Sequence, residues 1–124
     1  MLPFNVSFKT GLPVYEQVLY AVRKALVRGQ LAPGDAFPSV RALSQELKIN
    51  PNTAFKIVGV LKNEGILEVQ PGIGTVVSAS YEPPDKERLA LLEDTLETLA
   101  VNAKQLGLKR ADVINAFNEH WKNL

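Results

Sequence analysis

Apolar residues recur at helical spacing early in the chain and predict a first helix over residues 13–28. Proline suits the first turn of a helix, so we expect the helix to begin at Pro13. Gly29 follows the basic Arg28, an arrangement that is typical of a helix end. The apolar face of this helix consists of Val14, Val18, Val22, Ala25 and Leu26.

Two shorter amphipathic segments follow, and only a short link separates them. Ser39 is a good N-cap for a helix that ends near Lys48. Asn50 is an N-cap for the next helix, which Pro51 opens and Gly65 closes. This spacing is that of a helix-turn-helix. The expected buried positions are Val40, Leu43 and Leu47 in the first helix and Ala54, Ile57, Val58 and Leu61 in the second.

The periodicity then changes from helical to alternating. Segments 66–70 and 75–77 predict two strands, joined by a turn over residues 71–74 that contains Gly72 and Gly74. Two glycines leave little side-chain bulk at the tip, so its backbone can closely approach a phosphate or a minor groove. Taken alone, the turn is that of an ordinary hairpin. Next to a helix-turn-helix, we interpret the hairpin as a DNA-binding wing.

The last third of the chain predicts two more helices. A linker over residues 78–84 ends in two prolines, and a long helix is expected over residues 85–105. Gly107 ends that helix, and Lys109 or Arg110 opens the last one. The apolar positions are Leu89, Leu92, Leu96, Leu99, Ala103 and Leu106 in the long helix and Val113, Ile114, Phe117 and Trp121 in the last helix.

These two apolar faces predict a dimer. Two helices cannot bury both surfaces within one chain, so a second copy of the chain is the natural partner, and symmetric dimers are the commonest oligomers. The alternative is that the helices fold back on the first domain. The predicted dimer interface consists of Leu89, Leu92, Leu96, Leu99, Phe117 and Trp121.

Together the elements predict a mainly α fold with a small β-hairpin. Residues 1–78 are expected to form a winged helix-turn-helix, and residues 79–124 a two-helix C-terminal dimerisation element. A chain of 124 residues is long enough for one compact domain and such an appendage.

The composition narrows the functional classes. The absence of cysteine excludes disulfides and thiolate-ligated metal sites. The net charge of +1 is unevenly divided, with eight basic against five acidic residues over 1–80 and six against eight over 81–124. This division of charge fits a nucleic-acid-binding module joined to a part that does not bind nucleic acid. No signal-peptide pattern and no apolar run of about 20 residues is visible, so we expect a cytoplasmic protein without a membrane partner.

The helix that Asn50 caps begins with side chains suited to DNA recognition. Asn52 and Thr53 lie in its first turn, where recognition helices reach base edges. Lys56 lies one turn later on the same face as Asn52. Arg41 lies in the first turn of the preceding helix, where its guanidinium is a forked donor for a phosphate.

Several separated blocks, in the right order, resemble the GntR family of bacterial transcription factors. They extend from residue 13 to residue 77, about half of the chain. The two-helix tail, including residues 104–108, resembles the small YtrA-type subfamily and is too short for the effector domains of other branches. The matching blocks are Pro13-Val14-Tyr15-Glu16-Gln17, Pro33-Gly34-Asp35, Phe37-Pro38-Ser39-Val40-Arg41, Asn50-Pro51-Asn52-Thr53, Glu64-Gly65 and Pro71-Gly72-Ile73-Gly74-Thr75.

The resemblance implies a transcriptional regulator, expected to be a repressor, that binds a pseudo-palindromic DNA operator as a homodimer. An unidentified small-molecule effector could bind in the dimer interface, and no cofactor is expected. The implied DNA contacts are Arg41, Asn50, Asn52, Thr53, Lys56 and Gly72.

Three positions depart from the family pattern or are unusual within it. Many relatives have arginine or lysine where Pro51 stands, although proline is common in the YtrA-type branch. Val58 replaces a frequent aromatic residue. Phe55 is an exposed aromatic residue that could touch a thymine methyl group or pack against the wing.

The sequence offers little for catalysis or metal binding. His120 is the only histidine, and acids such as Asp94 and Glu97 lie on a solvated helix flank without a basic partner nearby. The segment 72–74 lacks the third glycine and the following helix of a phosphate-binding loop. We therefore expect no catalytic residue and no metal site. The remaining alternative is a winged-helix module that binds a protein or RNA instead of an operator.

Overall fold

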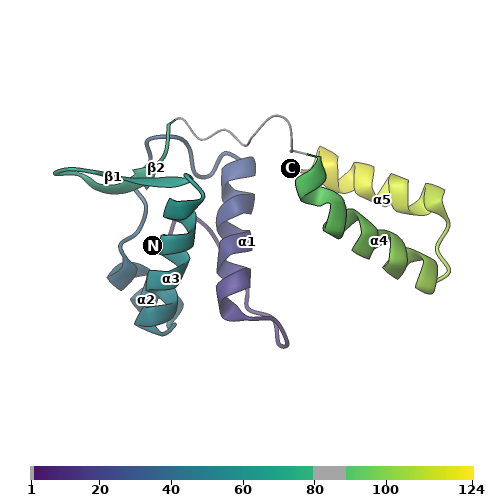
Figure 1. The fold of residues 1–124 in the computed structure, drawn as a ribbon, viewed down its shortest axis with the longest axis horizontal. Coiled ribbons are helices and arrows are strands. Elements are labelled where there is room, and N and C mark those ends of the chain that lie inside the picture. Colours follow the sequence, from purple (N-terminus) through teal and green to yellow (C-terminus); the bar gives the residue numbers. More distant parts are fainter. Residues whose placement is uncertain (1, 80–88) are drawn as a thin grey trace. The chain divides into compact units, whose positions relative to one another are not determined.

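The computed structural model describes residues 2–79 and 89–124. The chain divides into two compact units, Met1–Tyr81 and Glu82–Leu124. Among the described residues, the first unit contains three helices and a two-stranded hairpin, and the second contains two helices preceded by a short 3-10 turn (Figure 1). The predicted fold class, mainly helical with a small hairpin, is confirmed.

One hydrophobic core holds the first unit together. Helix α1 (Val14–Val27) and helix α3 (Pro51–Asn63) run side by side, and helix α2 (Val40–Leu47) packs against α3 (Figure 1). The face that α3 buries is the predicted one, since all four of its expected core positions are buried. The largest side chains with almost no exposed surface are Leu31, Leu43, Ile57, Leu61, Val18 and Val22.

The buried face of α1 is wider than the sequence predicts. Val14 is exposed, whereas Leu19 and Ala21 are buried. The N-terminal segment packs on the same core and brings the ring of Phe4 against that of Phe37, with 6.0 Å between the ring centroids. Because both α3 and this segment contribute to the same core as α1, a wider arc of the helix is protected from solvent.

Polar side chains cap both helices of the helix-turn-helix at the predicted positions. The Ser39 hydroxyl oxygen accepts a hydrogen bond from the backbone N–H of Ala42 at 3.0 Å. The Asn50 side-chain oxygen accepts one from the backbone N–H of Asn52 at 2.8 Å. Each bond satisfies a backbone donor that the helix itself cannot pair.

The link between α2 and α3 is fixed by local hydrogen bonds. Lys48 ends α2 in the left-handed conformation, with φ 55°. The Ser44 hydroxyl donates a hydrogen bond to the Ile49 carbonyl oxygen at 2.7 Å, and the Ile49 N–H donates to the Ser44 carbonyl oxygen at 3.1 Å. These contacts turn the chain within a few residues and hold α3 in place relative to α2.

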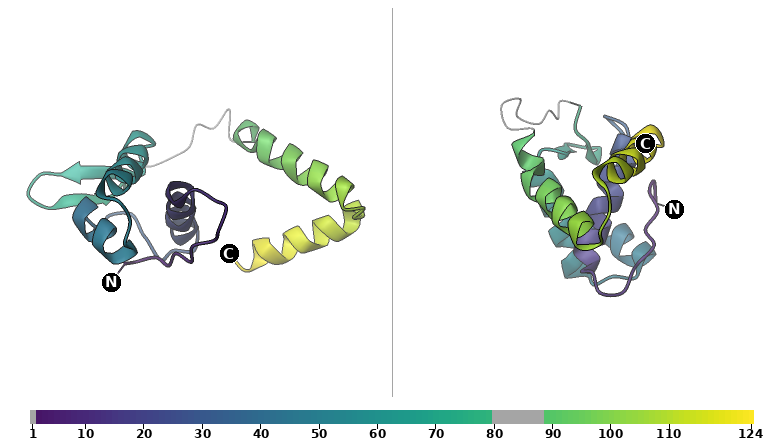
Figure 2. Two further views of the ribbon diagram at one scale, coloured as in Figure 1. Left: turned by 90° about the horizontal axis from the view of Figure 1, so that it is seen from below. Right: turned by 90° about the vertical axis from the view of Figure 1, so that its right-hand side faces the viewer.

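The hairpin is attached to the helices through its second strand. Strand β1 (Leu67–Gln70) pairs antiparallel with β2 (Gly74–Val77). Backbone hydrogen bonds between residues 34–37 and β2 join the hairpin to the segment that leads into α2. The base of the hairpin is therefore held, and its tip extends beyond the helices (Figure 2).

The second unit is a helical hairpin. The 3-10 turn η2 (Ala90–Leu92) precedes helix α4 (Glu93–Gln105), and helix α5 (Arg110–Lys122) follows a turn. The α-helix begins later than the predicted start at residue 85, and residues 85–88 lie outside the described part of the chain. Acidic residues favour a helix N-terminus, so Glu93 and Asp94 in the first turn fit the observed start.

The second unit buries little of its apolar surface. Helices α4 and α5 diverge from the turn that connects them (Figure 2). Of the described residues in this unit, Ala103 alone is buried. All six residues of the predicted dimer interface are exposed in the single chain.

The packing of Phe4 predicts that the N-terminal segment stabilises the first unit. Phe4 is 4% exposed, whereas Phe8 of the same segment is 43% exposed. We expect Phe4→Ala to lower the free energy of unfolding by about 3 kcal/mol, because it leaves a cavity beside Phe37. Phe8→Ala is the matched control and should cost less than about 1 kcal/mol. Urea unfolding of both variants measures the difference, and equal losses would contradict this account of the segment.

Candidate nucleic-acid interface

The first turns of α1 and α3 lie at the same end of the first unit (Figure 1). The polar residues at the start of α3 remain outside the core because the opposite face of the helix is buried. Asn52 is exposed and Thr53 is half-buried. The amide of Asn52 and the hydroxyl of Thr53 are groups that recognise base edges or phosphates.

Asn50 has a structural task in addition to the predicted contact with DNA. Its side-chain oxygen is used as the cap of α3, as described above. The amide NH₂ group has no partner among the described residues, and it can still donate to a phosphate oxygen. The cap thus orients the Asn50 donor while it fixes the start of α3.

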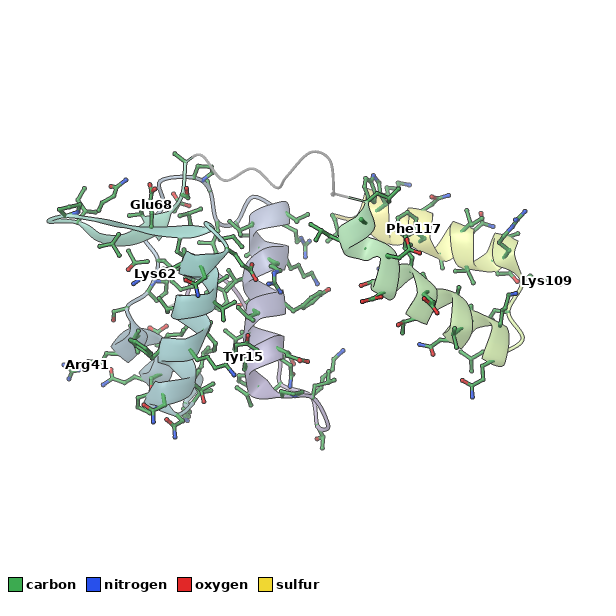
Figure 3. The ribbon with its side chains drawn as sticks, in the orientation of Figure 1. Tyr15, Arg41, Lys62, Glu68, Lys109 and Phe117 are labelled. Atoms are coloured by element: carbon green, nitrogen blue, oxygen red, sulfur yellow. The ribbon has the colours of Figure 1, made fainter. Side chains whose placement is uncertain are left out.

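Arg41 extends from the outer side of α2 (Figure 3). It is exposed, and no ion pair occupies its guanidinium within the described part of the chain. By contrast, Arg23 of α1 pairs with Glu64 at the far end of α3, with 2.7 Å between nitrogen and oxygen. Arg41 is therefore available for a forked contact with a phosphate, whereas Arg23 already has an anionic partner.

Lys56 has a neighbour that the sequence alone does not reveal. Its ammonium nitrogen lies 4.4 Å from the centroid of the Tyr15 ring, within the range of a cation–π contact. Tyr15 belongs to the first turn of α1 and lies on the side that faces α3 (Figure 3). The two residues are far apart in the sequence, so no local spacing could have paired them.

The tip of the hairpin has the backbone of a tight turn. The Ile73 N–H donates a hydrogen bond to the Gln70 carbonyl oxygen at 3.0 Å, and Gly72 has φ 80°. Proline at the second position and a positive-φ glycine at the third are typical of a type II turn. A Cβ atom added at Gly72 would meet no atom within 4 Å, so the space around the tip is open.

Phe55 does not pack against the wing. The residue is 70% exposed on α3, which contradicts the packing alternative raised from the sequence. The hairpin is anchored through β2 and residues 34–37, and its tip extends away from the helices (Figure 2). Phe55 remains open to solvent near the polar start of α3.

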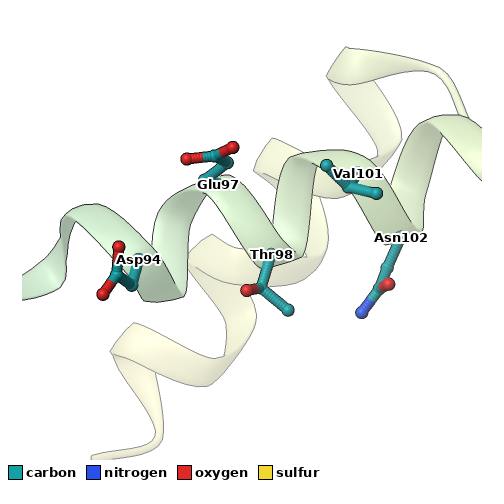
Figure 4. Close-up of a pocket in the computed structure, with 5 residues that line it drawn as sticks. All are labelled: Asp94, Glu97, Thr98, Val101 and Asn102. Carbon is teal, nitrogen blue, oxygen red and sulfur yellow. The ribbon is translucent and has the colours of Figure 1, made fainter.

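The acidic residues of α4 do not form a comparable site. Asp94 and Glu97 lie with Thr98, Val101 and Asn102 around a shallow hollow on one face of the helix (Figure 4). All five residues are exposed, and this face is opposite the predicted leucine seam. The hollow is the solvated side of α4, as its sequence pattern indicates.

Gly72 allows a test that separates turn geometry from contact with DNA. We expect Gly72→Val to lower the melting temperature modestly and to lower DNA affinity more than tenfold, because a branched side chain would hold the backbone away from a phosphate or groove. Gly29→Val is the matched control, since Gly29 has nearly the same φ, 79°, and equally open space at the end of α1. Differential scanning fluorimetry and DNA titrations on the same samples give both quantities.

The comparison of these two variants decides whether the tip touches DNA. Gly29→Val should lose stability to a similar extent and keep the wild-type affinity per folded molecule. If Gly72→Val also keeps that affinity, the glycine serves the turn alone and the hairpin is a scaffold.

The chain matches a known family over the first unit. The profile of the bacterial regulatory proteins of the gntR family matches residues 14–77, from α1 to the end of β2. YhcF of Bacillus subtilis, an uncharacterized HTH-type transcriptional regulator, is 33% identical over 111 residues, which cover 90% of this chain and 92% of that protein. The HTH-type transcriptional repressor YtrA of Bacillus subtilis is 31% identical over 106 residues, covering 85% of this chain and 82% of that protein.

Solved structures share the same architecture. A transcriptional antiterminator from Listeria monocytogenes superposes with a TM-score of 0.81 over 94% of this chain and 88% of that chain, at 24% identity, which shows the common fold. The DNA-binding domain of AraR in complex with operator ORX1 matches with a TM-score of 0.52 and 28% identity, over 60% of this chain and 95% of that chain. The family match and the similarity to YtrA along both units show that the chain belongs to the gntR family of bacterial regulatory proteins, in its YtrA-type branch.

Proposed function

We propose that this protein is a transcriptional regulator that binds a pseudo-palindromic DNA operator as a homodimer and represses transcription. The observation that carries the proposal is the exposed start of α3, which presents Asn52 and Lys56 in a helix-turn-helix with a wing beside it. In this arrangement α3 enters the major groove, α2 lies across the backbone, and the tip of the hairpin approaches the adjacent sugar-phosphate chain.

The homodimer is proposed from the second unit. Its helices leave two apolar faces in water, and Phe117 and Trp121 lie next to each other on one of them, with ring centroids 5.7 Å apart. Large exposed apolar surfaces mark places where another protein binds. A second copy of the same unit offers a surface of equal size and matching chemistry, and it would give the two-fold symmetry that a palindromic operator requires.

The relatives support repression and argue against an enzymatic role. YtrA of Bacillus subtilis is a repressor, and AraR binds operator DNA through its DNA-binding domain. A dimer bound to both half-sites would block access of RNA polymerase to a promoter, and this needs no catalytic activity. We place this function in the cytoplasm. None of the helices in the described segments is both long and apolar enough to cross a bilayer.

A competition experiment tests the proposal against the winged-helix alternative. The protein should bind a duplex selected from random-sequence DNA in moderate salt, and an RNA duplex of the same sequence should not displace it. Preference for RNA, or no binding to any selected duplex, would favour a module that contacts RNA or protein.

Two substitutions in α3 should separate base recognition from phosphate binding. Asn52→Ala should cost about 1–3 kcal/mol on the selected operator and relax the base preference at one position. Lys56→Ala should weaken specific and non-specific binding alike and reduce the slope of log affinity against log salt by about one unit. Fluorescence anisotropy at several salt concentrations measures both effects. Wild-type behaviour of both variants would show that α3 is not the recognition helix.

A charge in the leucine seam should dissociate the dimer. Leu96→Asp places an unpaired carboxylate in the predicted interface and should raise the dimer dissociation constant more than about 100-fold. Val101→Asp is the matched control, because Val101 is also an exposed apolar residue of α4 but lies on the solvated face. Light scattering, with circular dichroism to verify that the helices persist, should find a monomer for the first variant and a dimer for the second. A wild-type protein that is monomeric at micromolar concentration would refute the proposed dimer.

A further inference from the structure

The contact between Tyr15 and Lys56 joins a fixed ring to an exposed charge. Tyr15 is half-buried and packs against the core of the first unit, so its ring is held in position. Lys56 is exposed on α3, and its ammonium nitrogen lies over the ring face at 4.4 Å. Within the described part of the chain no carboxylate forms an ion pair with Lys56. The aromatic ring is thus the charged group's neighbour in this part of the chain.

We propose that Tyr15 is a positioning residue for DNA binding, whose ring holds the Lys56 ammonium where it can donate to a phosphate of the operator. The inference rests on the function proposed above and adds α1 to the elements that arrange the DNA-binding surface. A ring covers one side of an ammonium group, and the N–H donors on the other side stay free.

The place of the contact favours a phosphate over a base as the target. Lys56 follows Asn52 by one turn on the exposed face of α3, but its side chain reaches to the Tyr15 ring of α1, so its ammonium lies on the α1 side of that face. A recognition helix in a major groove has bases beneath it and sugar-phosphate backbones along its flanks. The ammonium on the α1 flank is therefore directed to a backbone.

The expected gain in DNA affinity comes from ordering of the Lys56 side chain in the free protein. A free lysine side chain has many rotamers, and fixing it on binding costs affinity. A ring that already restricts those rotamers removes part of this cost. The known strength of exposed cation–π contacts corresponds to an effect of about two- to fivefold on the dissociation constant.

A double-mutant cycle on the full chain tests the inference. Tyr15→Leu removes the aromatic face, and Tyr15→Phe, the matched control, keeps it. With a duplex selected from random-sequence DNA, Tyr15→Leu should weaken binding about two- to fivefold, and Tyr15→Phe should bind like the wild type. In a Lys56→Ala background, Tyr15→Leu should have no further effect, because the charge that the ring positions is gone.

The salt dependence of DNA affinity and the NMR shifts of the Lys56 side chain do not change when a variant only loses stability. Tyr15→Leu keeps Lys56, so its salt slope should equal that of the wild type, whereas Lys56→Ala should reduce the slope by about 0.9. In the free protein the Lys56 side-chain protons should be shifted upfield by the ring in the wild type and in Tyr15→Phe, and not in Tyr15→Leu.

The outcomes that would overturn the inference can be told apart. An equal loss of affinity from Tyr15→Leu with and without Lys56 would show that Tyr15 acts by another route, and a loss in Tyr15→Phe would point to its hydroxyl group. Tighter binding by Tyr15→Leu would show that the ring withholds the lysine from DNA. A wild type that binds no DNA would overturn the proposed function as well, whereas a wild type that binds, with no coupling in the cycle, would overturn this inference alone.

Discussion

Burial of one face of α3 determines which of its side chains can reach DNA. Ala54, Ile57, Val58 and Leu61 pack into the core with α1 and α2, so the helix cannot rotate without exposing them. The same packing leaves Asn52 and Lys56 outside and places Tyr15 next to Lys56. The composition of the proposed DNA-binding surface is thus a consequence of the core and of the two N-caps that set where α2 and α3 begin.

The second unit has the opposite character, because most of its apolar side chains remain in water in the single chain. Helices that diverge from their turn leave most of both faces uncovered (Figure 2). If these faces are buried in a dimer, one protein can occupy both half-sites of an operator only after two chains have associated. Stability of the second unit and affinity for the operator would then depend on the same leucine and aromatic contacts.

Much of this structure could be predicted from the sequence, because local signals and tertiary packing agree there. The caps at Ser39 and Asn50, the buried face of α3 and the glycine turn of the hairpin all have short-range causes. The features that could not be predicted depend on residues far apart in the chain. Phe4 of the N-terminal segment packs into the same core as α1, and the Lys56 ammonium lies over the ring of Tyr15. Periodicity likewise does not specify where the hairpin is anchored, and Phe55 is exposed in the resulting structure.

The proposed function requires that two copies of the chain present two recognition helices to one symmetric operator. Selection of binding sites from random-sequence duplex DNA, followed by sequencing and by the mass of the complex, tests it most directly. A homodimeric regulator should select an inverted repeat whose half-site centres lie about one helical turn, or a multiple of it, apart, with two protein chains on each duplex. Recovery of a single asymmetric element that is occupied by one chain would contradict it.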